Sequence, residues 1–338
     1  MKKNRLYLII FVVLLVVAAI LIISNSKVTL SKELRDFAIE DTASITKIYM
    51  ANKSDQEVVL DKDENNQWFV NGKYPVRKES IDLILKTINR IEVRAPVSDA
   101  ARDNTIRNLA GRSTKVEIYK KNKLLKVFYV GGATQDQRGT FLMIEGSTTP
   151  FVAHIPGFSG YLSSRFFIDE ELWRDPGIFR YNSDDIKTVN IVNTYNPEQS
   201  FKLSRLDDGK FNLVPISRKR KPEEFDSLSV LHYTNQFKNI CWEFVINKTD
   251  PVRKDSILST LPLFTITVED MTGNVNSVTA YTKPADGKED MDGNPLEIDD
   301  ERMLAIINGE NNFYTIQYNI FDRIFVEYDS LLPKTGNL

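Results

Sequence analysis

The chain has 338 residues, with 44 lysines and arginines against 46 aspartates and glutamates, for a formal net charge of −2. Hydrophobic residues make up 42% of it and include 19 phenylalanines, which indicates folded cores and excludes a disordered chain. The balanced charge lacks the basic excess of a nucleic-acid-binding protein, and the single Cys241 excludes intramolecular disulfides and multi-cysteine metal sites. At about 150 residues per domain, this length predicts two domains.

Residues 1–24 predict a cytoplasmic stub and a transmembrane signal anchor. Lys2, Lys3 and Arg5 precede an uncharged apolar run, Leu6–Ile23. As a helix this run would extend about 27 Å, close to the thickness of the hydrocarbon core of a bilayer. The positive-inside rule then places the N-terminus in the cytoplasm and the body across the membrane. A cleaved signal peptide is the alternative, but its apolar core is shorter, at about 7–15 residues.

After a lead-in over residues 25–44, the first domain is expected over residues 45–178. Apolar residues that recur at spacings of three and four predict one amphipathic helix, and they are Ile81, Ile84, Leu85, Ile88 and Ile91. Alternating apolar and polar residues predict short strands around residues 45–49, 57–60, 67–70, 115–119, 125–130, 141–144 and 151–155. An aromatic segment over residues 160–167 is expected to close this domain as a helix.

Residues 179–332 repeat this order of patterns and predict a second domain. Strands are expected around residues 186–190, 200–203, 210–214, 264–268, 275–281, 303–307 and 313–316. A weaker helical stripe follows Pro222 and consists of Phe225, Leu228, Leu231, Asn235 and Phe237. Residues 318–325 predict another closing helix, and the tail over 333–338 is expected to be loose.

Runs of strands with few helices predict an α+β fold. The expected architecture is an N-terminal transmembrane helix followed by two tandem, homologous, mainly antiparallel-sheet domains, each with one or two helices. The apolar residues Trp173, Ile178 and Phe179 at the join predict a packed connection, so we expect the two domains to touch. The paired aromatic residues of the closing segments are expected to seal the two cores, and they are Phe166, Phe167, Phe321 and Phe325.

No catalytic constellation is recognisable in the sequence, so we expect no catalytic, cofactor-binding or metal-binding residue. His154 and His232 have no histidine or cysteine at metal-ligand spacing, and the sequence contains no Gly-x-Ser-x-Gly motif. Scattered carboxylates such as Glu170, Glu171 and Asp175 leave an envelope hydrolase as a minor alternative.

Three further segments invite a chemical interpretation. The acidic residues of 286–300 are of the type that binds calcium, but an EF-hand register would put Lys288 at the first ligand position. We therefore expect a solvated hairpin loop there, with cation binding left open. Gly131 and Gly132 predict a tight turn at an exposed hairpin tip rather than a phosphate-binding loop. The apolar neighbours of Cys241 predict a buried thiol.

The basic run is the one candidate binding segment, and it consists of Arg218, Lys219, Arg220 and Lys221. Four consecutive cations are suited to anionic lipid headgroups or to an acidic protein partner. The alternative is a solvated loop that leads into the second predicted helix.

The opening strand of each domain, the strand Gln67–Val70 and the proline-then-helix that follows it resemble the bacterial domain-of-unknown-function family 4340. The resemblance covers most of residues 30–330. It implies membrane-anchored, tandem-repeat envelope proteins, often encoded beside gliding-motility-type ABC transporter components, and it supplies no catalytic residues. The second domain departs from the pattern, because Phe211 stands in place of Trp68 and because the basic run interrupts it.

These observations predict a non-catalytic, single-pass accessory or scaffold protein of the bacterial inner membrane, with its body in the periplasm. It would bind other envelope proteins, such as an ABC-type transport or gliding-type complex, and would use no cofactor and no nucleic acid. The alternative is a periplasmic binding module that holds a glycan, lipid or peptide in the cleft between its domains. The ligand, the partner and the oligomeric state are open at this stage.

Overall fold

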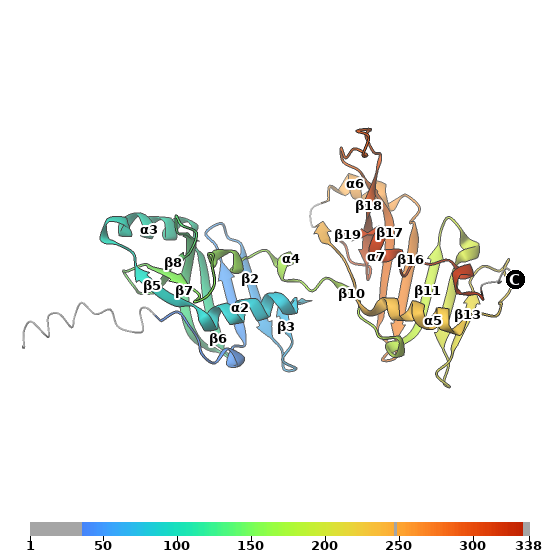
Figure 1. Ribbon diagram of the computed structural model, residues 1–338, viewed down its shortest axis with the longest axis horizontal. Coiled ribbons are helices and arrows are strands. Elements are labelled where there is room, and N and C mark those ends of the chain that lie inside the picture. The colour runs from blue at the N-terminus through green and yellow to red at the C-terminus, as the bar shows by residue number, and fades with distance from the viewer. Residues whose placement is uncertain (1–35, 247–248, 334–338) are drawn as a thin grey trace, which may run out of the picture. The chain divides into compact units, whose positions relative to one another are not determined.

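The computed structural model describes residues 36–246 and 249–333 (Figure 1). The chain divides into two compact units, Met1–Asp175 and Pro176–Leu338. Within the described ranges, no helix combines the length and the apolar character needed to cross a membrane. The run Leu6–Ile23 lies outside them.

The first unit is built on an antiparallel sheet of nine strands in the order β4-β3-β2-β1-β6-β7-β8-β9-β5. The strands are β1 Lys47–Ala51, β2 Glu57–Lys62, β3 Trp68–Val70, β4 Tyr74–Pro75, β5 Glu92–Pro96, β6 Thr114–Lys120, β7 Lys123–Ala133, β8 Thr140–Ile144 and β9 Phe151–His154. The helical elements are η2 Thr42–Ser44, α2 Lys78–Arg90, α3 Asp99–Arg112, η3 Ser163–Arg165 and α4 Glu170–Trp173.

The core of the first unit lies between α2 and one face of this sheet. Ile81, Ile84 and Ile88 of α2 are buried against Ile48 and Met50 of β1, which confirms the predicted helical stripe. Side chains alternate between the two faces of a strand, so Ile48 and Met50 both point toward α2. The closing segment is shorter than predicted, because only a single 3-10 turn, η3, forms within residues 160–167.

Helix α3 was not predicted, and it contacts β7 and β8. It buries only Thr105 and Leu109, too few apolar residues for a visible helical stripe. Gly131 lies inside β7, where an added Cβ atom would come within 2.6 Å of Leu109 Cδ2, so a larger residue there would have to displace the Leu109 side chain of α3. The prediction of a hairpin tip at Gly131 is therefore wrong, and the turn follows at residues 134–139.

The second unit is built on an antiparallel sheet of eight strands in the order β13-β12-β11-β16-β17-β18-β19-β15. The strands are β11 Ile186–Asn193, β12 Phe201–Arg205, β13 Phe211–Pro215, β15 Phe244–Ile246, β16 Phe264–Asp270, β17 Val275–Pro284, β18 Ile298–Ile307 and β19 Phe313–Gln317, and β10 Gly177–Phe179 pairs separately with β14 Ile240–Cys241. The helical elements are η4 Ser183–Asp185, η5 Pro197–Gln199, α5 Ser227–Thr234, η6 Asn235–Lys238, α6 Pro251–Leu258, α7 Tyr318–Phe321 and η7 Tyr328–Leu331.

The core of the second unit lies between one face of this sheet and the elements packed against it, which are α5, η6 and the closing segment. Val230, Tyr233 and Phe237 pack in the same cluster as Val189 and Ile191 of β11. The closing segment forms one helical turn, α7, rather than a helix over 318–325. The aromatic residues of both closing segments contribute to the two cores, as predicted. Cys241 is half-buried in β14, so the prediction of a fully buried thiol is wrong.

The two sheets share one strand order. Reading along each sheet, eight strands of the first unit correspond in turn to the strands of the second: β3 to β13, β2 to β12, β1 to β11, β6 to β16, β7 to β17, β8 to β18, β9 to β19 and β5 to β15. The difference lies at one edge, where β4 pairs with β3 in the first sheet and β13 is the outermost strand of the second.

Candidate functional site

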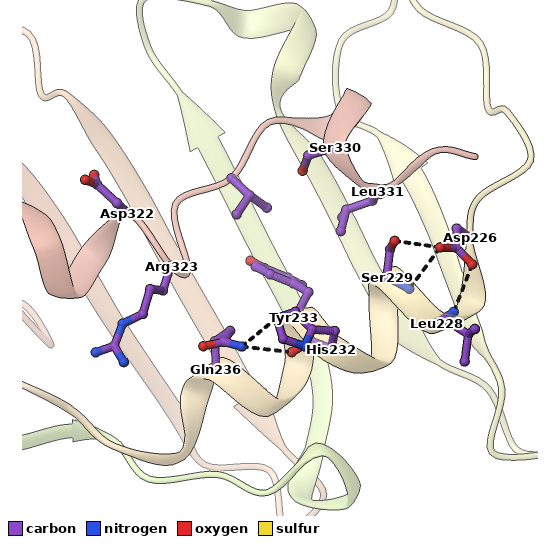
Figure 2. A pocket seen from close by; sticks show the side chains of 11 residues that line it. Asp226, Leu228, Ser229, His232, Tyr233, Gln236, Asp322, Arg323, Ser330 and Leu331 are labelled. Atoms are coloured by element: carbon purple, nitrogen blue, oxygen red, sulfur yellow. Dashed lines mark hydrogen bonds between the residues drawn. The ribbon is translucent and has the colours of Figure 1, made fainter. Parts of the chain in front are cut away.

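A groove of about 710 Å³ opens in the second unit between α5 with η6 and the segment that runs from α7 to η7 (Figure 2). Apolar side chains and a few polar groups share its lining, as in many binding sites. The lining residues are Asp226, Leu228, Ser229, His232, Tyr233, Gln236, Asp322, Arg323, Val326, Ser330 and Leu331.

The first wall of the groove is α5, which begins at an N-cap. The Asp226 carboxylate accepts hydrogen bonds from the backbone N–H groups of Leu228 and Ser229, at 3.1 and 3.3 Å, and from the Ser229 hydroxyl at 2.6 Å. The Ser229 hydroxyl, followed by these N–H groups, lowers the pKa of the Asp226 carboxyl. Satisfying the first N–H groups in this way fixes where the helix starts.

The phase of α5 differs from the predicted stripe. The buried side chains recur at Val230, Tyr233 and Phe237, so the helix turns a different face to the sheet. Leu228 and Leu231, predicted to be core residues, are 75% and 47% exposed. Two leucines therefore face solvent on the helix that forms the groove.

Tyr233 joins the two walls of the groove. Its hydroxyl donates a 2.9 Å hydrogen bond to the backbone carbonyl of Ile324, and its ring packs edge-on against Phe201 and Phe237. Burial raises the pKa of the Tyr233 phenol well above its ordinary value. The groove thus has a fixed, neutral floor.

The polar groups of the groove are not connected as a catalytic triad (Figure 2). The Ser229 hydroxyl is bonded to Asp226, whereas His232 Nε2 lies 3.1 Å from the side-chain nitrogen of Gln236. A hydrolytic serine needs a hydrogen bond to the histidine that accepts its proton. This arrangement offers hydrogen-bond donors and acceptors to a bound molecule, and Arg323 adds a positive charge at the far end.

The four cations of the predicted binding segment do not act alike. Arg220 donates to Glu223 through Nε and Nη2, at 3.0 and 2.9 Å, and forms an ion pair with Asp329 of η7. Its guanidinium carbon also lies 4.2 Å from the centre of the Tyr328 ring. Arg220 therefore holds η7 in place, while the other three cations of the run, Arg218, Lys219 and Lys221, are exposed.

Replacing Arg220 with alanine is expected to destabilise the second unit by about 1–2 kcal/mol, because Glu223 and Asp329 lose a shared charged donor and Tyr328 loses its stacked cation. Urea unfolding of the full chain in detergent measures the change. Lys219→Ala is the matched control and should change stability by less than about 0.5 kcal/mol. Equal effects of the two substitutions would show that Arg220 is as solvated as its neighbour.

The acidic segment forms the loop between β17 and β18, as predicted. Asp299 is its buried residue, and both of its oxygens are bonded to lysines, Oδ2 to Lys283 at 2.9 Å and Oδ1 to Lys288 at 3.0 Å. Across the described residues, no cluster of histidine, cysteine and carboxylate side chains is arranged to hold a metal ion.

The remaining sequence candidates other than His232 are residues of the first unit and do not line the groove. Glu170 accepts a hydrogen bond from the Asn71 side chain, and burial together with the nearby Asp169 raises the pKa of Glu171. The backbone N–H of Asp175 donates to the Pro75 carbonyl at 2.8 Å. His154 ends β9 in the first unit, so only His232 of the two histidines lines the groove.

Fold and site together define a two-unit α+β protein whose second unit carries an open groove suited to binding. The chain belongs to the family described as Domain of unknown function (DUF4340), whose model matches residues 68–258, more than half of its length. The match runs from β3 of the first unit to the end of α6 in the second. No curated protein and no solved structure matches the chain.

Proposed function

We propose that this protein is a non-catalytic, single-pass accessory protein of the bacterial inner membrane that binds a segment of another envelope protein through its second unit. The apolar run Leu6–Ile23, preceded by cations, supports the anchor and its orientation, with the N-terminus in the cytoplasm and the body in the periplasm. The family resemblance supports an ABC-type transport or gliding-type complex as the source of the partner.

One observation carries the binding proposal: α5 exposes Leu228 and Leu231 beside the groove. Burying apolar surface contributes about 25 cal/mol per Å². A partner segment that covers both leucines and enters the groove gains this contribution, while His232, Gln236 and Arg323 supply a polar rim. An apolar centre with a polar rim is the usual anatomy of a protein–protein interface.

The shared strand order of the two sheets supports a second part of the proposal, that the units arose by tandem duplication. A duplicated body lets one copy diverge while the other keeps the ancestral structure. The edge at β13 and the basic run are two of the places where the second unit departs from the first. The cleft between the domains and the hydrolase alternative stay predictions.

In-cell photocrosslinking tests the partner and the surface together. A photoreactive residue at position 228 or 231 is expected to give an adduct with one or a few envelope proteins, which mass spectrometry identifies. Position 261 is the matched control, because Leu261 is also an exposed leucine of the second unit but does not belong to α5 or line the groove. The proposal is rejected if positions 228 and 231 capture no protein beyond those captured from position 261.

A further inference from the structure

Strand β13, at the edge of the second sheet, has backbone groups that point away from the sheet. Bonds from Ile216 N to Ser200 O at 2.9 Å and from Leu206 N to Lys210 O at 2.7 Å bracket the β12–β13 pairing. Between them, Phe211, Leu213 and Pro215 occupy the positions of an antiparallel ladder that do not bond to the neighbouring strand. Two N–H groups and three carbonyls of β13 therefore face outward.

The first sheet shows what covers these positions in the other unit. Trp68 and Val70 of β3 hold the same register against β2 that Phe211 and Leu213 hold against β12. Their outward carbonyls accept hydrogen bonds from Val76 N at 2.9 Å and Lys73 N at 3.0 Å, the residues on either side of β4. The edge of the first sheet is thus closed by the chain's own next strand.

The second unit has no such strand in its described residues. After Pro215 the chain enters the basic run instead, and the described part of the structure contains no hydrogen bond to the outward groups of Phe211 or Leu213. An unpaired edge is a template for pairing with another chain unless proline, charge or a covering segment blocks it. Here only Pro215, at the end of the strand, lacks an N–H group.

We infer that β13 accepts an extended segment of the partner protein as an added strand, and that this segment alternates apolar and acidic residues. On the core side, Phe211 and Leu213 would border the added strand. On the other side, Asn212 and the cationic Lys202 are exposed. An alternating segment places apolar side chains on the first side and carboxylates on the second.

The basic run gives this edge its charge preference. The side chains of Arg218, Lys219 and Lys221 are exposed and have no ion pair within the described residues. They begin three residues after the end of β13, so carboxylates at or beyond one end of the added strand would neutralise them. Main-chain bonds then supply affinity, and charge complementarity selects the partner and steers its approach.

The inference rests on the proposed function and names the class of partner segment. Full-length protein in detergent is mixed with a fluorescent nine-residue peptide of alternating valine and glutamate, and anisotropy measures the dissociation constant. Phe211→Pro removes one outward N–H while leaving the bonds to β12 in place, and proline is tolerated at such edge positions. Phe211→Ala is the matched control, which loses the same ring but keeps the N–H. We expect the proline variant to bind about ten-fold more weakly than the alanine variant.

The charge arm uses two triple variants with the same change in net charge. Arg218→Glu/Lys219→Glu/Lys221→Glu is expected to abolish the preference for the glutamate peptide over a valine–lysine peptide. Lys86→Glu/Lys123→Glu/Lys238→Glu changes exposed lysines of α2, β7 and η6, which are not part of β13 or the basic run, and should preserve that preference.

A third peptide tests the inference on the unchanged protein, so the test does not depend on the folding of the proline variant. The valine–glutamate peptide with a central proline should not bind the unchanged protein, because it cannot complete the ladder. Equal binding of both peptides, or equal binding by the two Phe211 variants, overturns the inference. If position 228 crosslinks a partner while these peptides fail, the proposed function stands and the added strand is rejected.

Discussion

Replacing Trp173 with alanine is expected to destabilise the first unit by about 3–5 kcal/mol, the usual cost of removing a fully buried aromatic side chain. The indole is completely buried and stacks on Phe167, with ring centres 4.1 Å apart. Its Nε1 donates a 3.0 Å hydrogen bond to the Phe167 carbonyl. The substitution therefore leaves both a large cavity and an unbonded carbonyl.

Urea unfolding of the full chain, followed by hydrogen exchange in peptides of β1 and β6, measures this loss in the first unit. Trp173→Phe is the control that keeps most of the volume and loses only the N–H donor, so we expect a cost of about 1–2 kcal/mol. A loss below about 1 kcal/mol for the alanine variant would mean that the first core closes around the missing ring.

Sequence patterns predicted a helix or strand correctly where the apolar residues of a long segment all lie on one buried face. The stripe of isoleucines predicted α2 almost to its ends, because a helix that covers one sheet must repeat its apolar residues at three and four. The positions of the main strands along the chain followed from alternation and turn residues in the same way. The apolar join was interpreted as a connection between domains, but Trp173 packs in the first core and Phe179 in the second. Contact between the domains stays a prediction.

The sequence failed where local patterns allow more than one solution. Around α5, apolar residues stand on two faces of the helix, so the choice between Leu228 and Val230 as the buried residue depends on the sheet beneath. The helices α3 and α6 bury very few apolar side chains and left no stripe. Tertiary packing determines whether such segments form helices and which face they bury, and the local pattern of a single sequence does not reveal that packing.

The candidate site shows the same limit. Sequence alone identified the basic run but did not separate Arg220, which is committed to Asp329 and Glu223, from three cations that face solvent. It also did not show that β13 lacks the partner strand that β3 has, because β4 is only two residues long. A comparison of the segments that follow Val70 and Leu213 was the available signal, since Pro75 in one is replaced by a run of cations in the other.

The second large effect is expected at Asp299, whose carboxylate is buried near the start of β18. Burial by itself raises the pKa of this carboxyl, but hydrogen bonds from Lys283, Lys288 and the backbone N–H of Glu301 overcome it and lower the pKa to about 2. The ordinary pKa of an unfolded aspartate is about 3.9. A folded pKa below the unfolded one means that the carboxylate stabilises the fold above pH 4, and that this contribution is lost as the pH falls from about 4 to about 2.

A shift of about two pKa units corresponds to about 2–3 kcal/mol, so Asp299→Asn is expected to lose that much stability at pH 7. This loss arises mainly because Lys283 and Lys288 are left without their shared carboxylate. Urea midpoints measured between pH 2 and pH 7 give the test, with the exposed neighbour Asp300→Asn as the control. The two curves for the native chain and Asp299→Asn should converge as the pH approaches 2, since protonation removes the same charge as the substitution. Curves that stay parallel down to pH 2 would show that the asparagine variant fails for reasons of packing rather than charge.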